Sequence, residues 1–111
     1  MEKTDIIATL GALSQETRLD IVRYLVRKGP VGASAGEIGD HLSVTSATLA
    51  FHLNILTGAK LLSRQRSGRN IIYRASYGNI HVMTAYLLEN CCCEADETTE
   101  SKSLRGRKSA S

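Results

Sequence analysis

Residues 34–62 read SAGEIGDHLSVTSATLAFHLNILTGAKLL and contain two helix signals on either side of a short turn. Ser34 and Glu37 have the spacing of a capping box, which predicts a short helix that runs through Leu42. The turn at 44–46 carries helix-capping residues, and a second helix is expected to follow it. Two short helices joined by a turn of three or four residues are typical of a helix-turn-helix unit.

The second helix, which is expected to end near Thr57, has an apolar face and an opposite face of small and polar residues. At 100° per residue, Leu49, Leu53 and Leu56 cluster within about 60° and are expected in the core. His52 lies at the edge of this face and is expected to be a hydrogen-bonded structural residue rather than a ligand. The opposite face and its flanks are predicted to contact DNA through Ser46, Ala47, Thr48, Ala50, Phe51 and Asn54. Ser, Thr and Asn can hydrogen-bond to base edges and Ala or Phe can touch a thymine methyl, although the phenylalanine could instead cover a neighbouring side chain.

A basic hairpin is predicted directly after this helix. Residues 61–66 and 70–75 are strand-like, and Ser-Gly-Arg between them is a hairpin signal. The arginines near its tip, Arg64, Arg66 and Arg69, suit the DNA backbone or the minor groove. Residues 41–88 contain one Lys and four Arg and no Asp or Glu, so this region carries a charge of +5. Such a region indicates a polyanionic partner, and the alternative is a basic solvated face.

Apolar residues at helical spacing predict two helices before residue 34 and one after the hairpin. Ser14 is expected to cap the second helix, which should end at residues 28–30, Lys-Gly-Pro. The last helix is predicted from about Asn79 to Asn90. Its two apolar faces, one available to the domain and one to a partner, are formed by Ile80, Met83 and Leu87 and by Val82 and Tyr86.

The chain of 111 residues is long enough for one domain, and its hydrophobic content of 42% allows a packed core. We expect a mainly α domain with a β-hairpin over residues 1–93. The polar tail, 94–111, cannot bury enough apolar surface to fold alone and is expected to be disordered. No apolar run approaches the roughly 18 residues that a membrane span needs, and no secretory signal is evident, so a cytoplasmic protein without membrane contact is expected.

Three segments together resemble the ArsR (ArsR/SmtB) family of repressors. Residues 42–62 are similar to the family's recognition segment, residues 13–22 (LSQETRLDIV) resemble its opening Leu-x-x-x-x-Arg-Leu helix, and residues 68–73 (GRNIIY) resemble the end of its wing. The resemblance implies a winged helix-turn-helix homodimer that is formed through the first and last helices. It also implies binding to an inverted repeat in double-stranded operator DNA and release when a metal or metalloid binds.

The chain departs from the family pattern at several positions. Lys60 stands where Gly is usual, which would cost about 1 kcal/mol if a left-handed backbone is needed. Phe51 stands where a polar or basic residue is common. The third-helix thiolate site would need cysteines within 37–44, and the last-helix zinc site would need partners for His81, so neither sensor site is expected.

The three cysteines, Cys91, Cys92 and Cys93, are contiguous and odd in number, so they cannot form a disulfide framework. Thiolates are soft ligands that select soft metals. In a continuous helix the three side chains would point 100° apart, but a left-handed cap at Asn90 would let 91–93 be irregular. Three thiolates could then surround trivalent arsenic in a pyramidal arrangement, whereas zinc would require a fourth ligand. Some ArsR members carry a Cys-Cys pair after a similar Glu-Asn for arsenite, and Glu89-Asn90 precedes the pair here.

The resemblance therefore indicates a transcriptional repressor whose inducer is trivalent arsenic, with antimonite as a related inducer. Because the third thiol is adjacent here, the role of Cys93 stays open, as does a two-thiol site for a monomethylated trivalent arsenical. Two alternatives keep the same fold: the protein is a redox-sensing repressor, or its thiols have no sensing role. A thiol-dependent arsenate reductase is the alternative from another class, but no anion-binding loop surrounds the cysteines and a helix end rather than a helix start precedes them, so an enzyme is not expected.

Overall fold

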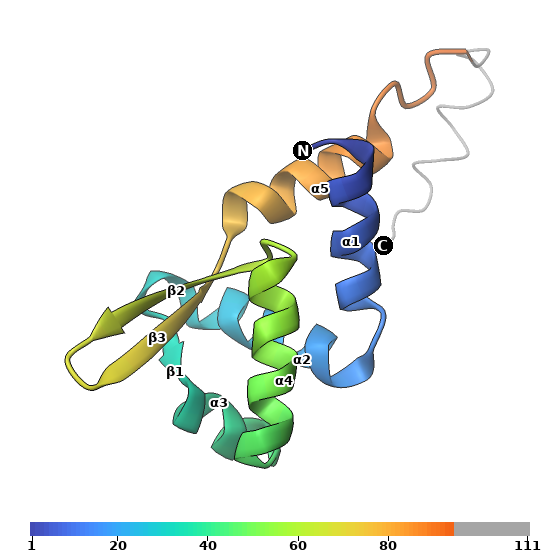
Figure 1. The fold of residues 1–111 in the computed structure, drawn as a ribbon. Coiled ribbons are helices and arrows are strands. Elements are labelled where there is room, and N and C mark those ends of the chain that lie inside the picture. Colours follow the sequence, from blue (N-terminus) through green and yellow to red (C-terminus); the bar gives the residue numbers. More distant parts are fainter. Residues whose placement is uncertain (95–111) are drawn as a thin grey trace.

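The computed structural model describes residues 1–94 and shows five α-helices with a small antiparallel sheet at one side, from which the hairpin extends (Figure 1). In chain order the elements are α1 (Lys3–Leu13), α2 (Glu16–Lys28), the 3-10 turn η1 (Gly29–Val31), β1 (Ala33–Ser34), α3 (Ala35–Leu42), α4 (Ser46–Gly58), β2 (Leu62–Ser67), β3 (Asn70–Ala75) and α5 (Tyr77–Leu88). The sheet order is β1-β3-β2, with β2 and β3 forming the hairpin. The predicted mainly helical fold with a β-hairpin wing is confirmed. Apart from Glu94, the predicted tail lies outside the described residues.

The core lies where α2, α3 and α4 meet the sheet. The predicted inner face of α4 is confirmed, because Leu49, Leu53 and Leu56 are all buried. They pack in one cluster with the buried side chains of the neighbouring elements, namely Ile21, Val22, Leu25, Ala33, Ile38, Leu61, Leu62, Tyr73 and Ala75. Burying an aliphatic side chain of this size contributes about 1.5–3 kcal/mol, so this cluster holds α4 in a single orientation.

The α3–α4 unit is held together by caps and by one close approach. The predicted capping box is present: the Glu37 backbone N–H donates to Ser34 Oγ (3.2 Å), and the Ser34 backbone N–H donates to Glu37 Oε1 (2.9 Å). At Gly39 an added Cβ would lie 3.1 Å from the Val44 carbonyl oxygen and 3.3 Å from Leu49 Cδ2. Glycine therefore lets α3 approach α4 more closely than a larger residue would allow.

Two predictions about helix ends are wrong. Ser14 does not cap α2. The cap is Gln15, whose longer amide side chain reaches back so that Oε1 accepts from the Arg18 N–H (2.9 Å), while the Ser14 hydroxyl donates to the Gly11 carbonyl at the end of α1 (2.8 Å). The last helix ends at Leu88 instead of Asn90, because the backbone of Glu89 is already extended (φ −58°, ψ 133°).

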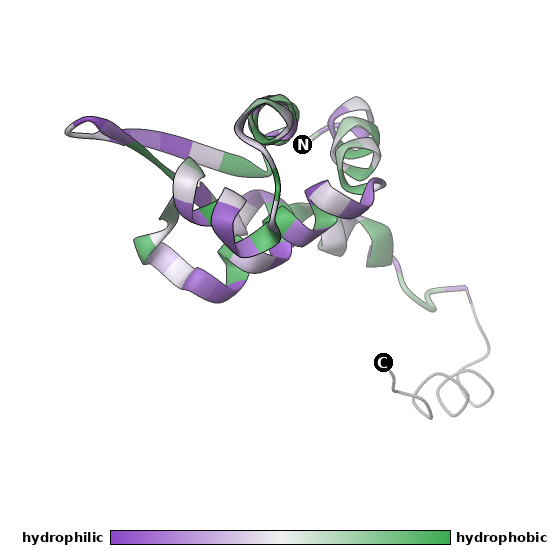
Figure 2. Cartoon of the chain, turned by 90° about the horizontal axis from the view of Figure 1, so that it is seen from below, coloured by the Kyte–Doolittle hydropathy of each residue, from purple (hydrophilic) through white to green (hydrophobic). Residues whose placement is uncertain are grey.

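The last helix contacts the domain through fewer residues than its pattern predicts. Met83 is buried and Ile80 packs against the core, but Leu87 from the same predicted face is 57% exposed. Leu88 is also exposed, and the last turn of α5 stands out as hydrophobic in Figure 2. Among the described residues, no helix is long and apolar enough to cross a membrane.

Lys60 has a left-handed backbone, which is the condition under which we expected strain at this position. Its φ is +66°, and the turn after α4 has the two hydrogen bonds of a Schellman motif: the Leu61 N–H donates to the Leu56 carbonyl and the Lys60 N–H donates to the Thr57 carbonyl, both at 3.0 Å. Asn79 Nδ2 also donates to the Lys60 carbonyl (3.0 Å), which joins the start of α5 to this turn. A residue with a Cβ is therefore held in a conformation that favours glycine.

We predict that Lys60→Gly stabilises the protein by about 0.5–1 kcal/mol, because it relieves the left-handed strain at some cost in chain entropy. The urea unfolding midpoint measures this change. The matched control is Lys60→Ala, which removes the charged side chain but keeps the Cβ and should give no such gain. An equal gain in both variants would show that the Lys side chain, and not its backbone, was unfavourable.

Candidate nucleic-acid interface

The outer face of α4 is fully available to a partner. The residues predicted to contact DNA are all exposed, namely Ser46, Ala47, Thr48, Ala50, Phe51 and Asn54, and Phe51 has 60% of its surface accessible. The helix contains no charged residue at all. Burial of the leucine face fixes the rotation of the helix, so this outer face is presented as a unit.

The start of α4 is open at its backbone. The N-cap residue is Thr45, but its hydroxyl donates to Thr48 Oγ1 (3.1 Å) and no side chain caps the first-turn N–H groups. Uncapped N–H groups and the positive end of the helix dipole both favour an anion such as a DNA phosphate.

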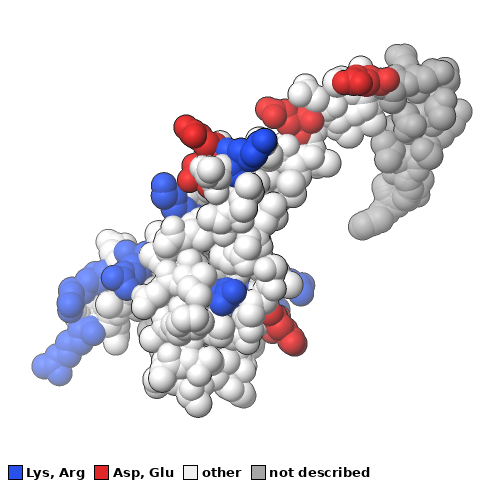
Figure 3. Space-filling view, turned by 45° about the vertical axis from the view of Figure 1, so that its right-hand side comes forward, with Lys and Arg blue, Asp and Glu red and all other residues white. Residues whose placement is uncertain are grey.

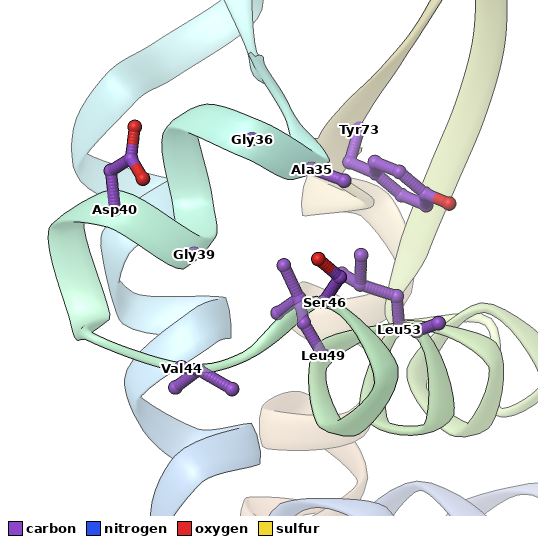
Figure 4. A pocket seen from close by; sticks show the side chains of 10 residues that line it. Ala35, Gly36, Gly39, Asp40, Val44, Ser46, Leu49, Leu53 and Tyr73 are labelled. Carbon is purple, nitrogen blue, oxygen red and sulfur yellow. The ribbon is translucent and has the colours of Figure 1, made fainter.

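A small hollow borders the same flank of α4 (Figure 4). It has a volume of about 190 Å³ and lies between α3, α4 and the ring of Tyr73 on β3, with Gly36, Gly39, Ser46 and Ala50 among its lining residues. This is smaller than the roughly 300 Å³ at which ligand pockets usually begin. Because the hollow separates α3 from this part of α4, α3 does not cover the flank of α4 that carries Ser46 and Ala50.

The hairpin places its arginines on two different faces. Cross-strand pairing sets Arg64 opposite Tyr73 and Arg66 opposite Ile71. Because side chains alternate along a strand, both arginines share the sheet face of Tyr73, which is the face that borders the hollow beside α4. Gln65 and Arg74, which are diagonal neighbours across the two strands, lie on the other face.

Arg74 is held in place, while the arginines nearer the tip are exposed. Arg74 Nε donates to the Pro30 carbonyl (2.7 Å) and Nη1 donates to Gln65 Oε1 (3.1 Å).

The tip of the hairpin is a two-residue turn formed by Gly68, with φ +66°, and Arg69, and such a turn favours glycine at its first position. Figure 3 shows Lys and Arg gathered over the hairpin, where no Asp or Glu is seen; on this face most Asp and Glu lie where α1 begins and α5 ends, and a further acidic group lies lower on the body of the domain. Within the described part of the chain, no carboxylate pairs with the hairpin arginines.

A buried histidine ties α4 to the first two helices. His52 is only 7% exposed, and its Nδ1 lies 3.2 Å from Arg18 Nη1, while Arg18 Nε donates to the Ala12 carbonyl at the end of α1 (2.7 Å). Burial lowers the pKa of His52 below its usual value, and the Arg18 charge lowers that pKa further. The imidazole is therefore neutral and can accept from Arg18, which confirms the structural role that we predicted. Arg18 could not be identified as its partner from the sequence, where the only signal is the position of this arginine in the Leu-x-x-x-x-Arg-Leu motif.

The cysteines lie at the far end of α5, outside regular structure. Asn90 is left-handed as predicted (φ +61°), and Cys92 is left-handed as well (φ +63°), so the segment coils into two tight turns. The Cys91 N–H donates to the Leu88 carbonyl (3.0 Å) and the Cys93 N–H donates to the Asn90 carbonyl (3.1 Å). All three side chains are exposed.

The structure brings two of the three thiols together. Cys91 Sγ and Cys92 Sγ are 3.5 Å apart, well beyond the roughly 2.05 Å of a disulfide bond. Within residues 1–94, no group of three or more His, Cys, Asp or Glu side chains is placed to hold a metal ion. Cys93 is therefore not part of a preformed three-thiol cluster.

Comparison with known proteins finds DNA-binding regulators. Residues 13–65 match a family model described as a helix-turn-helix domain. The transcriptional repressor SdpR of Bacillus subtilis is 36% identical over 62 residues, which are 56% of this chain and 66% of that repressor, slightly less than two thirds of its length.

Solved structures match nearly the whole chain. An ArsR-like transcriptional regulator from Rhodococcus sp. RHA1 is 28% identical and superposes with a TM-score of 0.71 over 95% of each chain. The homodimeric winged helix-turn-helix DNA-binding domain of Mb0332 from Mycobacterium bovis covers 97% of this chain and 89% of that one with a TM-score of 0.65. At 17% identity, the latter likeness concerns the fold alone.

We predict that Arg69→Ala weakens binding to all DNA sequences similarly, because a phosphate contact carries no sequence information. In a dimer, the slope of log affinity against log salt concentration should flatten by about one to two units. Fluorescence anisotropy at several salt concentrations measures this slope. Arg23→Ala removes an equal charge from the exposed side of α2 and should leave the slope unchanged. An altered base preference with an unchanged slope would show that Arg69 reads bases.

We also predict that the free energy of unfolding falls as the pH drops below about 6.5. The pKa of His52 is lower in the folded state than in the unfolded state, so the unfolded chain binds the proton first and gains stability as pH falls. Urea unfolding between pH 5 and 8 measures the effect. In His52→Asn, the amide oxygen can still accept from Arg18 but cannot titrate, so part of the pH dependence should disappear. An unchanged pH dependence in this variant would contradict the assignment to His52.

Proposed function

We propose that this winged helix-turn-helix protein, a transcriptional regulator of the ArsR type, is a repressor that binds operator DNA as a homodimer and releases it when trivalent arsenic binds its cysteines. The regulators that the chain matches are DNA-binding proteins and not enzymes. The observation that carries the arsenic part of the proposal is the pair of exposed thiols, 3.5 Å apart, at the end of α5.

The DNA-binding part rests on the exposed face of α4 and the basic hairpin beside it. A helix whose outward side chains are small apart from one aromatic ring fits the major groove, whose width of about 12 Å admits an α-helix. Arg64 and Arg66 lie on the sheet face that borders α4, where they can contact the neighbouring backbone. Since residues 41–88 contain no carboxylate, nothing in this region repels phosphate.

The homodimer rests on the apolar surface that α1 and α5 leave exposed. Ile7 and Leu10 on α1 and Val82, Tyr86 and Leu87 on α5 are exposed. Large apolar residues exposed together on neighbouring helices are typical of protein interaction sites. A second copy of the chain would bury these residues, and the Mb0332 domain, which has the same fold, is homodimeric. Two recognition helices would then face two half-sites about one helical turn of DNA apart.

The geometry of the two thiols fits a pyramidal soft centre. With bonds of about 2.3 Å, the length of zinc–thiolate bonds, sulfur atoms 3.5 Å apart subtend an angle of about 100°. This angle is narrower than the tetrahedral angle that zinc prefers. Cys91 and Cys92 can therefore hold trivalent arsenic with little movement, while Cys93 would have to turn inward to supply a third thiolate. A monomethylated arsenical requires only the pair that is already in place.

The coupling between the two functions would lie in α5. This helix carries the proposed dimer surface and leads directly into the cysteine segment, so any rearrangement of 89–93 acts on the dimer. A hundredfold loss of DNA affinity requires a difference in binding free energy of about 2.7 kcal/mol between the two states. Metal–thiolate bonds can supply this difference because thiolates bind soft ions strongly.

A second candidate function, redox sensing, is supported by the same pair of thiols. Two exposed cysteines at 3.5 Å could be oxidised to a vicinal disulfide, which would also change the end of α5. Such a ring is strained, and strained disulfides form less readily than relaxed ones. Peroxide in the absence of arsenic would release DNA in this case and not in the first.

We predict that Cys91→Ser and Cys92→Ser each keep operator binding but lose release by arsenite and by monomethylated trivalent arsenic. Serine keeps the approximate size of cysteine but replaces a soft donor with a hard one. Fluorescence anisotropy of a labelled operator duplex measures both affinities. Cys93→Ser is the matched control and should remain responsive to the monomethylated species.

The response of Cys93→Ser to arsenite then reports the number of thiols. A complete loss indicates a three-thiolate site, and a retained response indicates that the pair is sufficient. If all three serine variants still release DNA with arsenite, the cysteines are not the sensor. If peroxide alone releases DNA from the wild-type protein, the redox function replaces the arsenic function.

A further inference from the structure

The outer face of α4 exposes an apolar patch and no charged side chain. Ala47, Ala50 and Phe51, which we call the methyl patch, lie on the outer face of α4, where Ala50 and its neighbour Phe51 both follow Ala47 by about one helical turn. Phe51 is the only phenylalanine in the chain, and 60% of its surface is accessible. An aromatic side chain in this position gains little from folding, so it indicates a partner that buries it.

The ring of Phe51 is held near the surface by its buried neighbour. It meets the His52 ring edge-on, with 5.4 Å between the ring centroids and 62° between the ring planes. His52 is in turn fixed by its contact with Arg18. The patch is therefore a positioned feature of α4, although Phe51 belongs to no buried cluster of the domain.

The partner that this surface fits is a base pair with a methyl group. In the major groove, thymine presents a C5-methyl group that Ala and Phe can contact. Guanine is most often read by Arg or Lys and the cytosine amino group by Asp or Glu, and α4 has none of these residues. Asn54, which is exposed on the same helix, can form the bidentate contact that reads adenine.

We infer that α4 recognises its operator by thymine methyl groups, with Phe51 as the specificity-determining residue. This inference rests on the proposed DNA binding and adds the chemistry of the bases. Each half-site would present one or two thymines to the methyl patch and an adenine to Asn54. The hairpin arginines would contribute affinity without sequence preference.

Deoxyuridine tests the inference because it lacks only the thymine methyl group. Duplexes that bind the wild-type protein are first selected from a random pool, and each thymine of the selected half-site is then replaced singly by deoxyuridine. We expect one or two positions at which affinity falls about fourfold per half-site, the factor that corresponds to one buried methyl group. In Phe51→Ala, the same replacement should have no effect at the position that Phe51 reads.

The controls separate this inference from the DNA-binding proposal. Arg69→Ala should keep the deoxyuridine penalty although its overall affinity is lower. Phe51→Leu retains an apolar side chain and should keep part of the deoxyuridine penalty. The thermal melting temperature of both Phe51 variants should match that of the wild type, because the residue is exposed. If no duplex is selected, DNA binding itself fails. If duplexes bind but deoxyuridine equals thymine everywhere, or if the penalty persists in Phe51→Ala, the methyl readout is overturned. A change of oligomeric state in Phe51→Ala would assign the patch to a second copy of the chain and would also overturn it.

Discussion

The burial of one leucine face of α4 is the constraint on which the rest of the molecule depends. Leu49, Leu53 and Leu56 occupy the centre of the core, and a helix that buries one face must present the opposite face to solvent. This single constraint determines which side chains meet a partner. Gly39 supports it, because its missing Cβ allows α3 to lie directly against the turn and the first part of α4.

Polar contacts connect this helix to the elements that would form the dimer. The Thr9 hydroxyl on α1 lies 3.3 Å from the Ala59 carbonyl at the end of α4, and Arg18 joins the end of α1 to His52. A displacement of α1 would therefore change contacts at two positions, His52 within α4 and Ala59 directly after it. The thiols lie just after the C-terminal end of α5. In the mechanism that we propose, the exposed apolar face of α5 therefore connects ligand binding to DNA binding.

Much of this arrangement could be predicted from local sequence signals. The capping box at Ser34 and Glu37, the leucine face of α4 and the hairpin turn at Gly68 depend on residues that are close in the chain. At Lys60 the resemblance to a family with glycine there raised a left-handed backbone only as a condition, and the structure meets that condition.

Other features depend on tertiary contacts or on small energy differences between neighbours. The choice of Gln15 over Ser14 as a cap is a competition between two adjacent polar residues. The two-residue strand β1 exists only because β3 lies beside it, and the stacking of Tyr24 on His41, with ring centroids 4.4 Å apart, joins two different helices. The distance between the thiols could not be predicted without the backbone conformation of 89–93, because the sequence is compatible with both a helical and an irregular segment there.

The most direct test of this account is the anisotropy of a labelled operator bound to the wild-type protein while trivalent arsenic is added. The account predicts that the complex dissociates as arsenic approaches one equivalent per chain, and that a chelating dithiol restores it. A complex that survives an excess of both arsenite and the monomethylated species would contradict the account, whatever its affinity for DNA.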